Sequence, residues 1–393
     1  MKEMTCVVVG GGYAGIHAVK QIQKAASGQS QTQLRIVLID KNSYHLRKVL
    51  LFKPAAKQEE IKIPLTSLFP EGVQFIQAAV TKIEHQEQRL HYRDADGNNR
   101  LLSYDKLVLA AGSVVREPEP AQGGVALTDL AAAESIRQTW TGNLTKALNE
   151  NNAQERRRLM TISVAGAGIS GIETAAELAS VVREEAQRLG LDPNEVTIRL
   201  LNAHATLFEP ISSKAGSKLE SLLASYGVTV MHRSKVVRER DGVLTLASGQ
   251  TLPTGLCIWT LGLLPSPFLR TIGLPLTPDG YVPVDESYRV PGTRHVYSIG
   301  DCAHIIDVET GLADGKTCKE ASAQAARLAK IVFADWTGNA APTHKRYMDF
   351  FCIGLGPGRG MIWTRQWGLD IIIAGKLGWR IRKYTWDIAS LLA

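Results

Sequence analysis

The sequence predicts an α/β fold with two Rossmann-like dinucleotide-binding domains, one inserted in the other, followed by a C-terminal tail. The glycine spacing Gly-x-Gly-x-x-Gly occurs twice, beginning at Gly10 and again at Gly166. In both copies an apolar run typical of a buried strand precedes the glycines, and a helical pattern follows them. The 393 residues are sufficient for two such domains with sizeable cores.

The first copy contains predicted strands at 6–9, 34–39 and 107–111, with a helix that starts in the glycine segment. The first glycine permits a tight turn, the second lets the backbone approach a pyrophosphate, and the third lets the helix pack on the strand. Amide groups at the helix start favour phosphate, and an acid at the end of the second strand can bind ribose. The predicted cofactor-binding residues here are Gly10, Gly12, Tyr13, Ala14, Gly15, Asp40, Lys41, Ala111 and Gly112.

The second copy contains predicted strands at 160–165, 196–201 and 256–260, and a helix from about 172 to 189. Asn202 occupies the position at which a carboxylate would favour NADH by repelling a 2′-phosphate. Because an amide does not repel phosphate, and because Arg199 and His204 are close in sequence, the choice between NADH and NADPH stays open. The predicted nucleotide-binding residues are Gly166, Gly168, Ile169, Ser170, Gly171, Asn202 and Gly262.

Two later patterns belong with the first domain. A strand is predicted at 295–301, where it ends in Gly300-Asp301, and a helix at about 317–334. Glycine and proline residues after the third strand of the second copy and at 337–343 indicate linkers. The predicted division is 1–117 and 264–335 for the first domain, 118–263 for the second, and 336–393 for the tail.

The five cysteines are widely scattered, which argues against a disulfide framework or a zinc site. No metal-binding residues are predicted. The first residues lead directly into a strand pattern rather than a signal peptide, and no run of 18 apolar residues predicts a spanning helix. A cytoplasmic location is therefore expected.

The tail is basic and rich in tryptophan. From Lys345 onward the net charge is +5, against +7 for the whole chain, and the same stretch holds four of the seven tryptophans. The pattern is typical of a helix lying on an anionic membrane surface. Packing on the protein or in a homodimer is the alternative, and nucleic acid is not expected as a partner. The apolar stripe at helical spacing is Leu377, Ile381, Tyr384, Ile388, Leu391 and Leu392, flanked by Lys376, Arg380, Arg382 and Lys383, with Trp379 and Trp386 beside it.

Together these segments resemble the type II NADH dehydrogenases, the single-subunit NAD(P)H:quinone oxidoreductases of the two-dinucleotide-binding flavoprotein superfamily. The resemblance implies that the first glycine turn holds FAD and the second holds NADH or NADPH. It also implies that Asp40 contacts the adenosine ribose of FAD and that Gly300 and Asp301 lie beside the flavin. It covers roughly residues 5–335 and rests on VVVGGGYAGIHA, VLIDKNSYHL, YDKLVLAAGS, VAGAGISGIETAAEL, IWTLGLLPSP and VYSIGDCAH.

The same resemblance implies two catalytic candidates. Glu173 corresponds to a family glutamate that faces the flavin and nicotinamide and is linked to proton movement; an acid placed only to favour the helix dipole is the alternative. Gln324 lies in a segment similar to the AQxAxQ quinone-site signature, although Leu328 replaces its final glutamine. A purely structural role on a small-residue helix is the alternative for Gln324.

The expected function is hydride transfer from NAD(P)H to FAD, followed by two-electron transfer to a quinone at the inner face of the cell membrane. Superfamily relatives that reduce disulfides carry paired cysteines, which this chain lacks, so a diffusible acceptor is expected. A reductase of a small carrier protein such as ferredoxin, and a low-turnover flavin-based redox sensor, are the alternatives. The sequence does not identify the quinone or the oligomeric state.

Overall fold

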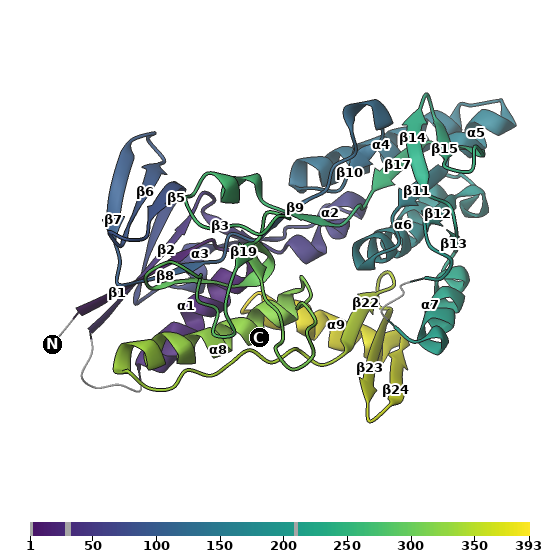
Figure 1. Ribbon diagram of the computed structural model, residues 1–393. Helices are drawn as coiled ribbons and strands as arrows, with labels where there is room; N and C mark the ends of the chain where they lie inside the picture. The colour runs from purple at the N-terminus through teal and green to yellow at the C-terminus, as the bar shows by residue number, and fades with distance from the viewer. Residues whose placement is uncertain (1–2, 28–32, 208–210) are drawn as a thin grey trace.

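The computed structural model describes residues 3–27, 33–207 and 211–393, and two sheets with helices packed on them form its framework (Figure 1). The predicted α/β class with two Rossmann-like sheets is confirmed. The larger sheet has the order β20-β8-β1-β2-β5-β6-β7. Its strands from β20 to β5 pair in parallel, and β5, β6 and β7 continue as antiparallel hairpins. The strands are β1 (Glu3–Val9), β2 (Gln33–Asp40), β5 (Val73–Glu84), β6 (Arg89–Asp94), β7 (Asn99–Ser103), β8 (Lys106–Leu109) and β20 (Val296–Ser298).

The second sheet is parallel throughout, with the order β10-β17-β11-β12-β13. The chain leaves the first sheet after β8 and returns to it at β20 only when the second sheet is complete, which accounts for the repeated glycine pattern. Its strands are β10 (Val125–Ala126), β11 (Thr161–Ala165), β12 (Thr197–Leu201), β13 (Val228–Met231) and β17 (Leu256–Trp259), and the accompanying helices are α4 (Leu130–Leu148), α5 (Ala153–Leu159), α6 (Ile169–Arg188) and α7 (Ser213–Ser225).

Smaller elements connect and extend these sheets. We call the larger sheet with its helices the first unit, and the second sheet with its helices the second unit. An antiparallel ribbon of β9 (Ser113–Val115) and β18 (Leu263–Pro265) lies where the chain passes between these two units. Helices α1 (Tyr13–Ala26) and α8 (Cys318–Thr337) pack together beside the first sheet (Figure 1). The others are α2 (Phe52–Ala56), α3 (Leu65–Leu68), β3 (Tyr44–Leu46), β4 (Lys62–Pro64), β14 (Val236–Arg240), β15 (Val243–Leu246), β16 (Thr251–Pro253), β19 (Val282–Pro283) and β21 (Ala303–His304).

The tail forms a sheet and a helix. β22 (Phe350–Gly354), β23 (Gly360–Gln366) and β24 (Leu369–Ala374) make an antiparallel sheet, and α9 (Gly375–Ala389) follows at once. Gly378 lets α9 approach β23, because a Cβ there would lie 2.5 Å from the carbonyl oxygen of Gly360. Among the described residues, no helix has both the length and the hydropathy needed to cross a bilayer.

One hydrophobic core joins three stretches that are far apart in sequence. Phe52 and Ala55 of α2 pack with the buried residues of α4, α6 and the second sheet, and Trp363 and Trp386 of the tail belong to the same cluster. Trp140 of α4 also donates a hydrogen bond of 3.0 Å to the carbonyl of Ala55. The second unit is therefore covered on one side by a segment from the first.

The sequence expectations differ from the structure in four places. The helix predicted from 172 begins already at Ile169, within the glycine segment, and the predicted strand at 107–111 ends at Leu109. The strand predicted at 295–301 is three residues long, since Gly300 begins a short 3₁₀ turn with φ of 74°. The sheet of β22, β23 and β24 was not predicted, because short strands separated by glycines carry no clear periodicity.

The first glycine turn allows a direct test of how its glycines differ. We expect Gly15→Ala to lower the free energy of unfolding by about 1–3 kcal/mol, because its Cβ would lie 1.7 Å from the carbonyl oxygen of Gly10. Gly12→Ala is the matched control, since no atom lies within 4 Å of a Cβ built there. Urea denaturation of the two variants measures the difference, and equal losses of stability would contradict the packing argument.

Candidate functional site

The carboxyl ends of the parallel strands bring the first set of predicted residues to one edge of the larger sheet. β1 leads into Gly10, β2 ends at Asp40, β8 leads into Ala111 and Gly112, and β20 leads into Gly300. Ligands of open α/β sheets bind outside this edge. Residues from four separate strands therefore meet where a dinucleotide would lie.

The first glycine turn fits a pyrophosphate. Gly12 is the residue before the first turn of α1 and is exposed, with open space where a Cβ would stand. The amides at the start of α1 can thus approach an anion without a side chain in the way. Ala14 and Gly15 lie buried behind the turn, and the hydroxyl of Tyr13 accepts a long bond of 3.4 Å from the amide of Val49.

Asp40 shapes the loop beside this turn. Its Oδ2 accepts a bond of 2.6 Å from the amide of Gly11, and its Oδ1 accepts one of 2.7 Å from the amide of Asn42. A carboxylate has further lone pairs, so ribose hydroxyls can still be bound. The side chain of Lys41 is exposed, and its carbonyl accepts a bond from Gln77.

Asp301 lies next to two half-buried lysines, Lys48 and Lys316, that the sequence did not single out. Its Oδ2 accepts a bond of 2.7 Å from the hydroxyl of Ser113, whose carbonyl accepts one of 3.0 Å from Lys48. Lys316 donates to the carbonyl of Ala303. Burial lowers the pKa of both lysines, and the negative charge of Asp301 opposes that shift. This edge of the sheet therefore carries positive charge beside the predicted flavin position.

Gln324 is buried, and both ends of its amide are engaged. Its Oε1 accepts a bond of 2.8 Å from the amide of Gly300, and its Nε2 donates one of 2.8 Å to Asp314. Gly300 is also packed closely against Ala14, which a Cβ at position 300 would approach to 2.7 Å. Gln324 therefore holds Gly300 against the start of α1, which makes it a positioning residue in this geometry.

The second glycine turn repeats the design of the first. Gly168 precedes α6 and has open space at its Cβ position, whereas Gly171 packs against the carbonyl of Gly166. Thr260 adds a hydroxyl bond of 2.9 Å to that same carbonyl. Ser170 is exposed, Ile169 half-buried, and Gly262 lies exposed beyond β17 on the same edge.

Asn202 is buried at the end of β12, and its amide is engaged within its own loop. Nδ2 donates to the carbonyl of Thr206 at 2.7 Å and lies 3.1 Å from Nδ1 of His232. Oδ1 accepts from the amide of His204 at 3.2 Å. These bonds fix the loop that would border the ribose. Arg199 lies in the middle of β12, where its Nη1 donates a bond of 2.7 Å to the carbonyl of Pro253.

Glu173 forms a buried ion pair with the tail. Only 2% of its surface is exposed. Its Oε1 accepts bonds of 2.9 Å from Nε of Arg382 and 2.7 Å from the amide of Gly354. Burial raises the pKa of Glu173, while the charge of Arg382 and the Gly354 bond act in the opposite direction. The carboxyl group is thus protonated at a higher pH than an exposed glutamate.

A second buried ion pair lies one helical turn further along α6. Lys53 of α2 donates to Glu177 at 2.7 Å, and its ammonium group stands 5.0 Å from the ring centre of Trp379. Burial raises the pKa of Glu177, and Lys53 opposes that shift. Charges from α2, α6 and α9 therefore meet in one buried cluster: Lys53, Glu173, Glu177 and Arg382.

One face of α9 packs against the protein, so part of the prediction that this helix lies on a membrane was wrong. Arg382 and Trp386 were grouped with lipid-facing residues, but both are buried, and Trp386 packs on Phe52 and Trp379. Asp387 pairs with Arg47 at 2.6 Å. Helical spacing reveals the faces of such a helix but not which face meets the protein, so the sequence could not assign Arg382 to Glu173.

Comparison with known proteins agrees with this geometry. A family model described as pyridine nucleotide-disulphide oxidoreductase matches residues 4–327. A type II NADH:quinone oxidoreductase of Staphylococcus aureus is 24% identical over 387 residues, which cover 94% of this chain and 91% of the relative. A demethylphylloquinone reductase of Synechocystis is 25% identical over 341 residues, covering 84% and 79%.

The fold comparison gives the same result. The NDH2 of Plasmodium falciparum, solved in complex with NADH, matches with a TM-score of 0.80 over 99% of this chain and 97% of that chain, at 14% sequence identity. The resemblance to type II NADH dehydrogenases is therefore confirmed, as is the prediction of an oxidoreductase. FAD and a pyridine nucleotide are the cofactors expected for the family. With both glycine turns inside the matched region, this chain belongs to the pyridine nucleotide-disulphide oxidoreductase family.

Proposed function

We propose that this protein is an FAD-dependent NAD(P)H:quinone oxidoreductase. The observation that carries the proposal is the pair of glycine turns, each open above its second glycine, with the buried acid Glu173 at the start of α6. The relatives named for quinone reduction align with most of the chain and support the same acceptor.

The residues of this chain would bind and orient the reactants. When bound, FAD supplies the chemistry by accepting a hydride from the nicotinamide and passing two electrons to a quinone. The amides before α1 and α6 would hold the two pyrophosphates, and Asp40 would hold the FAD ribose. Lys48 and Lys316 hold positive charge near Asp301, so the site favours the negative charge that reduction brings.

Glu173 is assigned to proton handling during quinone reduction. Two-electron reduction of a quinone consumes two protons, and a carboxyl group with a raised pKa keeps its proton to a higher pH and can deliver one. Arg382 then balances the charge that remains on the carboxylate. Gln324 acts indirectly in this scheme, because it holds the amide of Gly300 beside the flavin position.

The outward face of the tail is proposed to lie on a membrane that contains the quinone. Leu377 and Tyr384 on α9 are more than half exposed, and Trp367 at the turn between β23 and β24 is 93% exposed. Lys376, Arg380 and Lys383 are exposed on the same helix. Apolar side chains with cations around them suit an interface with anionic headgroups, which supports a peripheral enzyme.

Anaerobic reduction tests the function. The FAD-loaded protein is mixed with NADH or NADPH, and the flavin absorbance is followed before and after a pulse of a soluble quinone. We expect fast bleaching with at least one nucleotide and fast recovery with quinone. Bleaching that recovers only with a carrier protein such as ferredoxin, or with no acceptor tried, would refute quinone reduction. A protein that does not take up FAD would refute the flavin assignment.

The role of Glu173 is tested by Glu173→Gln. Because the pKa of the carboxyl group is raised, we expect the wild-type rate of flavin reoxidation by quinone to fall as the pH rises through that pKa. The glutamine variant should be slower by roughly 100-fold, with no such pH dependence. Glu177→Gln is the matched control one turn away. A pH profile that survives in Glu173→Gln would remove the residue from proton transfer.

Vesicle sedimentation tests the membrane surface. We expect the double variant Trp367→Glu/Leu377→Glu to lose most of its binding to vesicles that contain phosphatidylglycerol, because it places charges on the apolar surface. Leu101→Glu is the control, since Leu101 is 52% exposed on β7, far from the tail in Figure 1. Equal binding of both variants would mean that the tail is not the membrane contact.

A further inference from the structure

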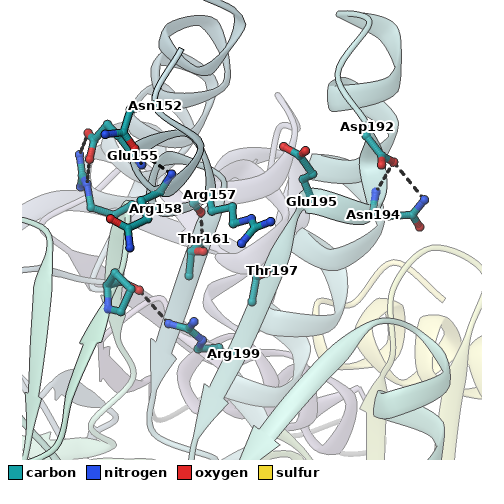
Figure 2. A pocket seen from close by; sticks show the side chains of 12 residues that line it. Asn152, Glu155, Arg157, Arg158, Thr161, Asp192, Asn194, Glu195, Thr197 and Arg199 are labelled. Atoms are coloured by element: carbon teal, nitrogen blue, oxygen red, sulfur yellow. Dashed lines mark hydrogen bonds and ion pairs between the residues drawn. The ribbon is translucent and has the colours of Figure 1, made fainter. Parts of the chain in front are cut away.

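A cavity of about 750 Å³ opens at the amino edge of the second sheet, and Figure 2 shows side chains that line it. Thr161 at the start of β11 and Thr197 at the start of β12 lie in its lining. The dinucleotide turn at Gly166 follows the other end of β11, and five residues of strand span about 16 Å. Dinucleotides bind at the carboxyl edge, so this cavity is a separate place in the fold.

Arg199 is one of two guanidinium groups in this cavity with few or no partners among the described residues. Its side chain is half-buried, and burial lowers its pKa. Within the part of the chain that the structure describes, its side chain makes one hydrogen bond, of 2.7 Å from Nη1 to the carbonyl of Pro253, and no ion pair. A guanidinium group has five N–H donors, so most of them remain for a ligand.

Arg157 brings a second guanidinium group to the same space. It comes from the end of α5, and Thr161 anchors that end by donating a bond of 2.7 Å to its carbonyl. Its side chain makes no hydrogen bond or ion pair with any described residue. Figure 2 shows Arg157 and Arg199 in front of the strands that carry Thr161 and Thr197.

The acids of the lining already have partners. Glu195 accepts two bonds, of 2.9 and 3.0 Å, from Arg156, and Glu155 accepts two from Arg158. Asp192 accepts from the amide and the side chain of Asn194. Glu155 and Glu195 are therefore neutralised by arginines, and Asp192 is hydrogen-bonded, whereas Arg157 and Arg199 have no carboxylate partner among the described residues.

We propose that this cavity binds a small phosphorylated molecule, with its phosphate groups held between Arg157 and Arg199. Arginine forks match phosphate oxygens in pairs, and the volume is in the range of small-molecule sites. Asn152 and Thr197 offer polar groups at the wall for the remainder of the ligand. The site is independent of the electron-transfer reaction, so its test does not depend on the acceptor.

Calorimetric titration of the FAD-loaded protein with inorganic pyrophosphate tests the proposal. An excess of NAD⁺ is present to fill the glycine turn at Gly166. We expect saturable binding by the wild type, at least 10-fold weaker binding by Arg199→Met, and none by Arg157→Met/Arg199→Met. Arg238→Met, an exposed arginine on β14 of the same unit, is the matched control and should bind like the wild type.

Two results would overturn the proposal: no saturable heat from the wild type at millimolar pyrophosphate in low salt, or equal affinity in the double variant. The single variant Arg157→Met separates a loss of binding from a loss of folding, because the Arg157 side chain is exposed and contacts no described residue. This variant should bind pyrophosphate more weakly, while its melting temperature without ligand stays at the wild-type value. ADP and fructose 1,6-bisphosphate, titrated in the same way, distinguish a nucleotide from a sugar phosphate as the bearer of the phosphates.

Discussion

The buried ion pair between Glu173 and Arg382 is the contact on which the arrangement of the chain depends. It joins α6 of the second unit to α9 of the tail, and Gly354 of β22 adds its amide to the same carboxylate. Further along α9, Asp387 pairs with Arg47 of the first unit. Removing one partner of a buried pair costs about 3–5 kcal/mol, so neither residue can be changed without consequence for the other.

The glycine turns could be predicted from the sequence because their requirement is local. A turn that must pass close to a carbonyl and to a phosphate admits only glycine, and the same spacing recurs wherever that geometry recurs. The strand ends at Asp40 and before Gly300 followed from the alternation of apolar runs and turns. The order of both sheets then places these residues on one edge each, as parallel sheets require.

The contacts between distant segments could not be predicted in this way. Arg382 sits among other tail cations at a spacing that suits lipid and protein equally, and only the fold selects Glu173 as its partner. Lys48 and Lys316 come from irregular segments with no periodic pattern, yet both converge on Asp301. Asn202 was expected to face the ribose from its position after a strand, whereas its amide bonds depend on a loop that turns back on itself.

The core shared by α2, the second unit and the tail has a consequence for the order in which the protein is made. Phe52 is synthesised well before the strands that it covers, and Trp386 joins the same cluster later still. The second unit therefore cannot bury its full apolar surface until the tail has been synthesised. Until then its uncovered face is open to chaperones.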